Sequence, residues 1–279
     1  MSRREFTALS IAAGVAAASG SLAHEANAAD VEIKTSAGTC DATLVHPQGK
    51  GQWPGAILFV DAFGLRPTMR DMAKRLAQDG YTVLVPNPYY RSARAPAVPP
   101  GANFSNPADR QKIMDLRAPL TADAVAQDAM AYAAFLDSQP SVKKSAKLGV
   151  FGYCMGGSMS VRAAAAVPDR IGGGASFHGG GLVTDKPDSP HLLVPKIKAQ
   201  FYFGVAANDD ASEPNAKTKL REAFDQTGGT AKIEVYEGCL HGWCVKDMPL
   251  SPDSKPIYNE AQAERAWNEL ISLFERTVV

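Results

Sequence analysis

The chain has 279 residues, and its 29 lysines and arginines balance its 29 aspartates and glutamates. A net charge near zero, without a run of like charge, argues against nucleic acid as a partner, so we expect a small molecule instead. The length suits one α/β domain with a sizeable core. Four cysteines in a chain this long do not make a disulfide framework.

Residues 1–28 are predicted to be an export signal that is removed. Arg3 and Arg4 form a twin-arginine pair ahead of the Ala-rich apolar run 9–18, and Ala26-Asn27-Ala28 offers a cleavage site of small residues. The apolar run is shorter than the roughly 20 residues that span a bilayer, so we expect no stable membrane anchor. The twin-arginine export machinery would carry the folded domain, residues 29–279, to the periplasm. A cytoplasmic protein with an amphipathic start is the alternative.

The next part of the chain predicts two strands at the edge of a sheet and then the first two buried strands. Residues 31–35 and 42–45 alternate enough to form antiparallel edge strands around a turn at Ala37 and Gly38, with Cys40 between them. The unbroken apolar runs 55–60 and 81–86 fit strands buried on both faces of a parallel sheet. Helical periodicity over 68–78 joins them into a right-handed crossover unit.

Residues 87–119 predict a long irregular excursion, because prolines and polar residues interrupt every periodic pattern there. Excursions of this length in a compact domain are usually functional. Beyond it, helices are predicted at 122–136, 158–167, 214–226 and 260–276, and strands at 148–151, 171–177, 198–203 and 232–236. This alternation predicts one α/β domain with a doubly wound, mainly parallel sheet and helices on both faces.

The stretch Gly152-Tyr-Cys-Met-Gly-Gly157 joins a predicted strand directly to a predicted helix. Its pattern Gly-x-Cys-x-Gly is typical of a nucleophile elbow, in which small residues on both sides let the strand and the helix approach closely. Cys154 would then lie at the positive end of a helix, which favours the thiolate. A buried structural cysteine is the alternative.

These residues resemble the elbow of the dienelactone hydrolase family, whose members have the α/β-hydrolase fold and use cysteine where most of their relatives use serine. The likeness covers the chain from about residue 30 to its end. The resemblance implies a hydrolase that cleaves a small ester or lactone through a Cys-His-Asp triad.

In this fold the nucleophile, the acid and the histidine follow one another along the chain, each in a loop after a strand. His241 lies between the last strand and the last helix, where the base is expected. His46 precedes the nucleophile, His178 follows it too closely, and His191 lies in a proline-flanked linker.

Asp209, in Asn208-Asp209-Asp210, is the predicted acid, because the family pattern of a Gly-rich strand end, an aspartate and a nearby proline fits best there. Asp210 is the close alternative. One of the two could instead cap a helix.

The backbone N–H groups of Ala62 and Met155 are predicted to form the oxyanion hole. At the position of Asp61 the family usually carries a glutamate that interacts with the resting thiol. The resemblance therefore implies that Asp61 is a supporting carboxylate, although its side chain is one methylene shorter than that glutamate. Capping of the helix that follows is the alternative role of Asp61.

The resemblance also implies substrate contacts. Arg91, in Pro88-Tyr-Tyr-Arg91, resembles the family arginine that holds a substrate carboxylate, so the ester or lactone is expected to carry one. The family's second arginine is replaced by Lys246. Its ammonium group is a point charge and lacks the bidentate geometry of a guanidinium. We expect four aromatic residues to line the pocket, although each could belong to the core: Tyr89, Phe63, His178 and Trp243.

Two other classes of protein fit some of these residues. Cys239 and Cys244 flank His241, which suggests a periplasmic redox or metal-handling thiol protein on the same fold. The third class is a non-catalytic binding protein. Because the two tight ligand pairs of a structural zinc site are missing, we expect neither a metal ion nor another cofactor.

Overall fold

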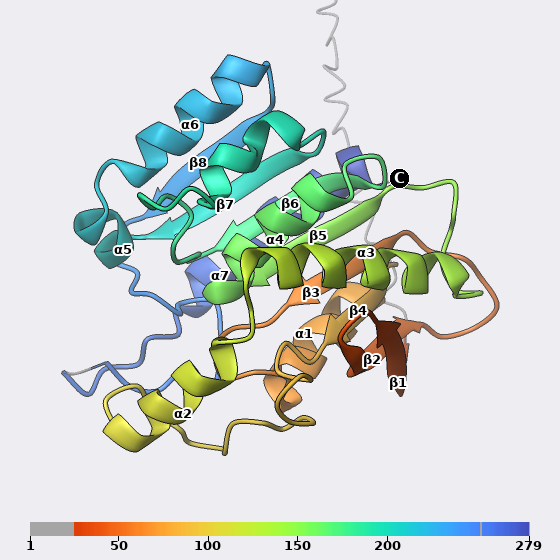
Figure 1. The fold of residues 1–279 in the computed structure, drawn as a ribbon, viewed down its shortest axis with the longest axis horizontal. Coiled ribbons are helices and arrows are strands. Elements are labelled where there is room, and N and C mark those ends of the chain that lie inside the picture. Colours follow the sequence, from red (N-terminus) through yellow and green to blue (C-terminus); the bar gives the residue numbers. More distant parts are fainter. Residues whose placement is uncertain (1–24, 252, 279) are drawn as a thin grey trace, which may run out of the picture.

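The computed structural model describes residues 25–251 and 253–278, which form a single eight-stranded sheet with helices on both faces (Figure 1). The strands are β1 (Ala26–Thr35), β2 (Gly38–Pro47), β3 (Gly55–Phe59), β4 (Thr82–Pro86), β5 (Leu148–Tyr153), β6 (Ile171–Phe177), β7 (Gln200–Ala206) and β8 (Ala231–Tyr236). Their order is β1-β2-β4-β3-β5-β6-β7-β8. β1 and β2 run antiparallel to their neighbours, and the pairs from β4 to β8 are parallel. The predicted fold class is confirmed.

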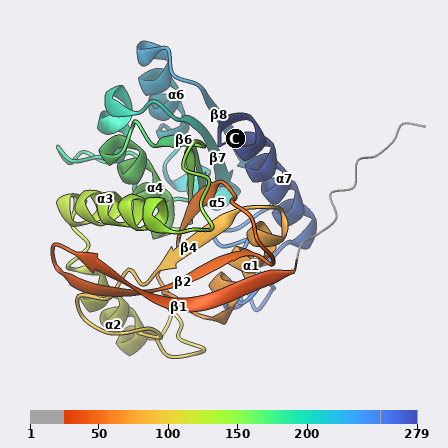
Figure 2. The same cartoon turned by 90° about the vertical axis from the view of Figure 1, so that its right-hand side faces the viewer.

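Helices cover both faces of the sheet. They are α1 (Pro67–Gln78), α2 (Pro107–Arg117), α3 (Ala122–Ser138), α4 (Met155–Ala166), α5 (Ala207–Ser212), α6 (Ala216–Thr227) and α7 (Glu260–Thr277), with a 3-10 helix, η1 (Pro190–Lys196). α1 and α7 lie on one side of the sheet, and α3 and α4 lie on the other (Figure 2). Every residue of β3, β4 and β5 is buried, as their unbroken apolar runs predict. Within the described ranges, no helix combines the length and the apolar character that crossing a membrane requires.

The N-terminal hairpin is longer than predicted. Its turn is at Ser36 and Ala37, so Cys40 lies within β2, fully buried, and not between the strands. β1 begins at Ala26, and the predicted cleavage motif 26–28 therefore forms its first residues. The twin-arginine pair and the apolar run lie outside the described residues.

The excursion 87–119 contains a helix, α2, that the sequence analysis missed. The side-chain oxygen of Asn106 accepts hydrogen bonds from the N–H groups of Ala108 (2.9 Å) and Asp109 (3.4 Å). Pro107 occupies the first helical turn, where its missing N–H costs nothing. The prediction of irregular structure was wrong here, because Pro107 starts a helix and does not break one. Short helices also replace the predicted loop after β7 and the linker around His191.

The helix after the elbow begins at Met155, three residues earlier than predicted, and it lies directly against the sheet. A Cβ atom at Gly156 would lie 2.1 Å from the carbonyl oxygen of Phe59 in β3, and one at Gly152 would lie 2.0 Å from the carbonyl oxygen of Gly156. Both obstacles are backbone atoms, which no side-chain rotation can remove. Glycine is therefore required at both positions for α4 to start where it does.

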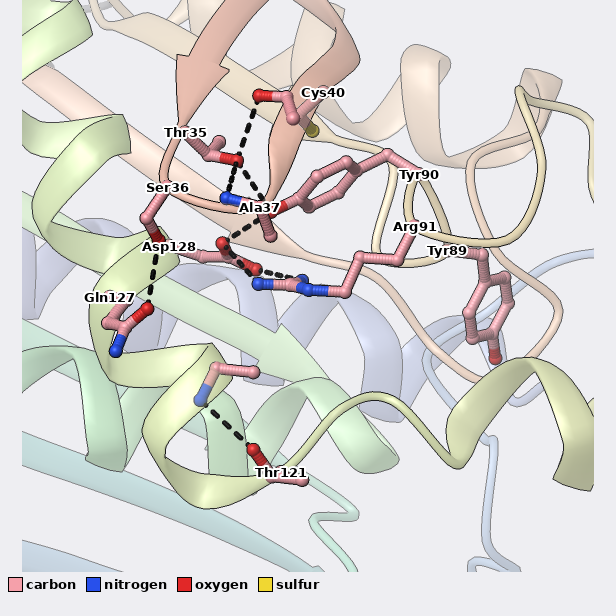
Figure 3. Close-up of polar contacts among 12 residues, drawn as sticks. Thr35, Ser36, Ala37, Cys40, Tyr89, Tyr90, Arg91, Thr121, Gln127 and Asp128 are labelled. Carbon is pink, nitrogen blue, oxygen red and sulfur yellow. Dashed lines mark hydrogen bonds and ion pairs between the residues drawn. The ribbon is translucent and has the colours of Figure 1, made fainter.

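A buried polar network ties the N-terminal hairpin and the segment after β4 to α3 (Figure 3). Asp128 of α3 accepts two hydrogen bonds from Arg91, Nη1–Oδ2 at 2.7 Å and Nη2–Oδ1 at 2.9 Å. It accepts a third from the Tyr90 hydroxyl at 2.7 Å, which also bonds Thr35 Oγ1 at 2.8 Å. Because the carboxylate of Asp128 is only 4% exposed, Arg91 is the counterion that permits its burial.

Arg91→Gln is expected to lower the free energy of unfolding by about 3 to 5 kcal/mol, because it leaves the buried carboxylate of Asp128 without its counterion. The matched control is Arg94→Gln, which breaks an ion pair with Glu32 whose side chains are 71% and 55% exposed. That control should change the free energy of unfolding far less, because both of its charges are already solvated. Urea unfolding curves of both variants measure the difference, and equal losses would contradict the structural role of Arg91.

Candidate active site

The parallel strands deliver the chemically active side chains to one edge of the sheet. Asp61 follows β3, Cys154 follows β5, His178 follows β6, Asp209 follows β7 and His241 follows β8. In open α/β sheets, ligands bind in the crevice at the carboxyl ends of the strands. The sheet therefore brings these residues together although they lie far apart in the chain.

Cys154 occupies the sharp turn between β5 and α4. Its φ of 55° and ψ of −119° lie in a region that residues other than glycine seldom adopt. Backbone hydrogen bonds hold this conformation: its N–H donates to the carbonyl of Phe177 (3.1 Å), and its own carbonyl accepts from Gly157 (3.0 Å) and Gly180 (3.3 Å). The side chain is partly exposed, at the N-terminal end of α4.

His241 lies between a carboxylate and the sulfur of Cys154. Its Nδ1 is 2.8 Å from Oδ2 of Asp209, and the thiol of Cys154 is close enough to raise the pKa of the imidazole. The backbone N–H of His241 donates to Oδ1 of Asn208 at 2.8 Å, which holds the loop. Asp210 points elsewhere and pairs with Nζ of Lys217 at 2.6 and 2.7 Å. Of the two candidate acids, Asp209 is the one that contacts the imidazole.

The partners of His241 favour its charged form. Burial by itself would lower the pKa of His241, but the hydrogen bonds to Asp209 and Cys154 and the negative charge of both groups raise this pKa to about 10. The imidazole therefore carries a proton at neutral pH. Because the folded-state pKa is above the ordinary value of 6.5, this ionisation stabilises the fold fully below about pH 6.5. The stabilisation is lost as the pH rises through about 10.

Two backbone N–H groups near Cys154 are free to bind an oxyanion. In the described ranges, neither the N–H of Ala62 nor that of Met155 donates a hydrogen bond. The loop that carries Ala62 is fixed on both sides, since the Tyr89 hydroxyl donates to the carbonyl of Ala62 (2.7 Å) and the N–H of Phe63 donates to Oδ1 of Asp61 (2.9 Å).

Asp61 is buried and bound to an arginine. Its two oxygens accept hydrogen bonds from Nη1 and Nη2 of Arg66 at 2.7 and 2.9 Å, and Arg66 also pairs with Asp247. Nowhere in the described chain does Asp61 bond Cys154. The alternative of helix capping is wrong, because α1 begins after Arg66 and no side chain caps it. Asp61 instead fixes the loop that carries Ala62.

A cavity of about 750 Å³ opens beside Cys154. Its walls are the start of α4, the end of α2 with the start of α3, and the segment 180–190. None of the five predicted substrate-binding residues lines it: Arg91, Tyr89, Phe63, His178 and Trp243.

These five residues make other contacts instead. Phe63 packs against Phe104, with ring centroids 5.5 Å apart. His178 and Trp243 are both fully buried, and the ring of His178 lies 4.8 Å from that of His241 and 5.3 Å from that of Trp243. Burial, together with the nearby charge of His241, holds the pKa of His178 well below its ordinary value, so this ring is neutral.

The cavity residues that the sequence analysis missed lie on α4, at the end of α2, at the start of α3 and in the segment 180–190. Ser158, Met159 and Arg162 follow Met155 on one face of α4, at the spacing i, i+3, i+4 and i+7. This pattern is visible in the sequence once the helix is started at Met155. Arg117 ends α2, the helix that was not predicted.

The remaining thiols and Lys246 lie away from the cavity. All four cysteines are free, and Cys40, Cys239 and Cys244 are buried. Among residues 25–251 and 253–278, no group of three or more potential ligands could hold a metal ion. Lys246 lies over the ring of Tyr258, 6.0 Å from its centroid, and borders a different cavity.

Comparison with known proteins places the chain in a family. The model of the dienelactone hydrolase family matches residues 40–278. A Synechocystis protein named "Putative carboxymethylenebutenolidase" is 29% identical over 238 residues, which cover 83% of this chain and 89% of that protein. A Methylorubrum extorquens protein of the same name is 28% identical and covers 99% of this chain and 93% of its own length.

A solved structure supports the fold. The "Putative Dienelactone Hydrolase" from Klebsiella pneumoniae superposes with a TM-score of 0.74 at 21% identity, covering 90% of this chain and 99% of that one. Because the family model matches most of the chain, this protein belongs to the dienelactone hydrolase family and is a hydrolase of the α/β-hydrolase superfamily.

Proposed function

We propose that this protein cleaves a small ester or lactone through a covalent thioester on Cys154, with His241 as the acid and base and Asp209 as the group that orients it. The observation that carries the proposal is the hydrogen bond of Asp209 to His241, with Cys154 close enough to the same imidazole to raise its pKa. A nucleophile, a base and an orienting acid in mutual contact are what acyl transfer requires.

The reaction has two steps. The thiolate of Cys154 attacks the carbonyl carbon, and the negative charge moves to the carbonyl oxygen, which the N–H groups of Ala62 and Met155 would bind. As the carbon–oxygen bond to the leaving group breaks, the imidazolium of His241 gives its proton to the alkoxide. Water then loses a proton to His241 and attacks the thioester, and collapse of the adduct breaks the carbon–sulfur bond, which releases the acid product and restores the thiolate and the imidazolium.

The charge on His241 suits both steps. In the resting site, the interactions with Asp209 and Cys154 raise the pKa of His241, so its proton is ready for the leaving alkoxide. Once Cys154 is acylated, its contribution is lost and only Asp209 continues to raise this pKa. The pKa of His241 must then fall, and the neutral imidazole can act as the base for water.

Cys154→Ala is expected to lower kcat/KM for p-nitrophenyl acetate and for a small lactone by about 10⁴-fold or more, because the covalent route is lost. Cys239→Ala is the matched control: this buried cysteine also lies near His241 in the chain, but it has no role in the proposed reaction, so the variant should keep most of the activity. Unchanged hydrolysis by Cys154→Ala would refute the mechanism. A large loss confined to Cys239→Ala would favour a redox function.

Asp209→Asn removes a hydrogen bond that raises the pKa of His241, so the imidazolium should be lost at a lower pH than in the wild type. We expect kcat/KM to fall by about 10² to 10⁴-fold at pH 7, and the pH profile to shift to lower values. Asp210→Asn, which affects only the pair with Lys217, should stay within about threefold of the wild type. Equal effects of the two substitutions on the pH profile would contradict the assignment of Asp209.

We also propose that residues 1–28 direct the folded protein to the periplasm by the twin-arginine route. The sequence motif supports this proposal. Cleavage after Ala28 would remove the first three residues of β1 and leave the strand paired with β2 from Ala29 onwards. Replacing Arg3 and Arg4 by lysine should retain the full-length chain in the cytoplasm. Cell fractionation and N-terminal sequencing test this, and a cytoplasmic, uncleaved wild type would refute it.

A further inference from the structure

The cavity beside Cys154 carries an excess of positive charge. Its lining includes three cations against one carboxylate: Arg117, Arg162 and Lys186 against Asp188. An uncharged ester or lactone makes no use of this charge. The cavity is therefore suited to a substrate with an acidic group.

Arg162, on α4, is a largely buried cation that lacks a close anionic partner in the described residues. Its side chain is only 15% exposed, and in the part of the chain that the structure describes its guanidinium donates no hydrogen bond. The nearest carboxylate oxygen, Oδ2 of Asp188, lies 3.8 Å from Nη2, and Asp188 is itself 52% exposed. Burial lowers the pKa of Arg162, and the charges of Asp188 and Asp123 offset this only in part. A bidentate anion would supply what this guanidinium lacks.

Arg117 reinforces this charge from the opposite wall. It ends α2, and the contact that it makes within the described residues is a long one, from Nη1 to the sulfur of Met114 at 3.9 Å. Arg91 differs from both, because Asp128 already neutralises it through two short hydrogen bonds. The free arginines of this site are thus on α2 and α4.

The position of His241 decides which half of the substrate enters the cavity. The leaving alkoxide takes its proton from His241, so the alcohol part must lie on the His241 side of Cys154. The cavity is lined by Cys154 and the α4 face but not by His241. The acyl part therefore enters it, along an apolar wall that includes Met155, Met159 and Val125.

The helix sets the length of this acyl chain. Cys154 and Arg162 are separated by about 12 Å along the axis of α4. The arginine side chain leans back toward the N-terminus of its helix and shortens that distance, so an acyl chain of about six to eight carbons would reach the guanidinium.

We propose that the cavity binds an acyl chain that ends in a carboxylate, and that Arg162, with Arg117 opposite, holds this carboxylate. The inference rests on the proposed thiol hydrolase and adds its substrate class: half-esters of medium-chain dicarboxylic acids, or lactones that carry an acidic chain on the acyl side. Arg162 is then a determinant of specificity.

The test compares two esters that differ only in charge, p-nitrophenyl hydrogen suberate and p-nitrophenyl methyl suberate. The wild type should have the higher kcat/KM for the charged ester, mainly through a lower KM. Arg162→Gln should reduce the ratio of charged to neutral kcat/KM by about tenfold or more, and Arg162→Lys should restore part of it.

Asp188→Asn removes the carboxylate that faces Arg162 and should raise the ratio by about twofold. Arg221→Gln, an exposed arginine of α6 outside the cavity, makes the same change in net charge and should leave the ratio unchanged.

The possible outcomes separate this inference from the proposed function. If the wild type hydrolyses neither ester, and not p-nitrophenyl acetate, the proposed function fails. If it hydrolyses both esters equally well, or if Arg162→Gln leaves the ratio unchanged, the hydrolase stands and the carboxylate site is overturned. The neutral ester reports the folding of each variant, because a misfolded variant loses both activities together.

Discussion

The close contact of α4 with the sheet is the constraint on which the site depends. Gly152 and Gly156 let the backbone of the helix approach β3 and β5 so closely that a Cβ atom at either position would clash with backbone atoms. This approach forces Cys154 into its positive φ and directs the sulfur out of the core, at the positive end of the helix. The strain is held by backbone hydrogen bonds from neighbouring segments, so Cys154 is positioned by the whole sheet and not by its own loop.

The electrostatics of the site follow from burial and from the choice of partners. His241 is charged because its interactions with Asp209 and Cys154 outweigh the cost of burial. His178, without a partner for either ring nitrogen in the described ranges, stays neutral beside it. A second positive ring only 4.8 Å away would oppose the charge on His241. Because His178 is buried and neutral, it packs against the ring of His241 without charge repulsion.

The same logic separates the arginines into two groups. Arg66 and Arg91 are bound by buried carboxylates, Asp61 and Asp128, and they hold the loop of Ala62 and the segment after β4 in place. In the described part of the chain, Arg117 and Arg162 face the cavity without a buried carboxylate as a partner. Arg66 and Arg91, which follow β3 and β4, thus serve the fold, whereas Arg162, on the helix that follows Cys154, has no such structural pairing. Side-chain pairing, and not position in the chain, distinguishes the two roles.

The sequence by itself determined the sheet, its buried strands and the elbow, because apolar runs, helical periodicity and the glycines around Cys154 act over a few neighbouring residues. It also placed Asp209 and His241 after the correct strands, since chain order in a parallel sheet decides which loops meet. It could not separate Asp209 from Asp210, assign Arg91 to Asp128, or find the cavity wall on α2 and α4. Those outcomes depend on which side chains from distant elements come within hydrogen-bonding distance, and only the tertiary structure decides that.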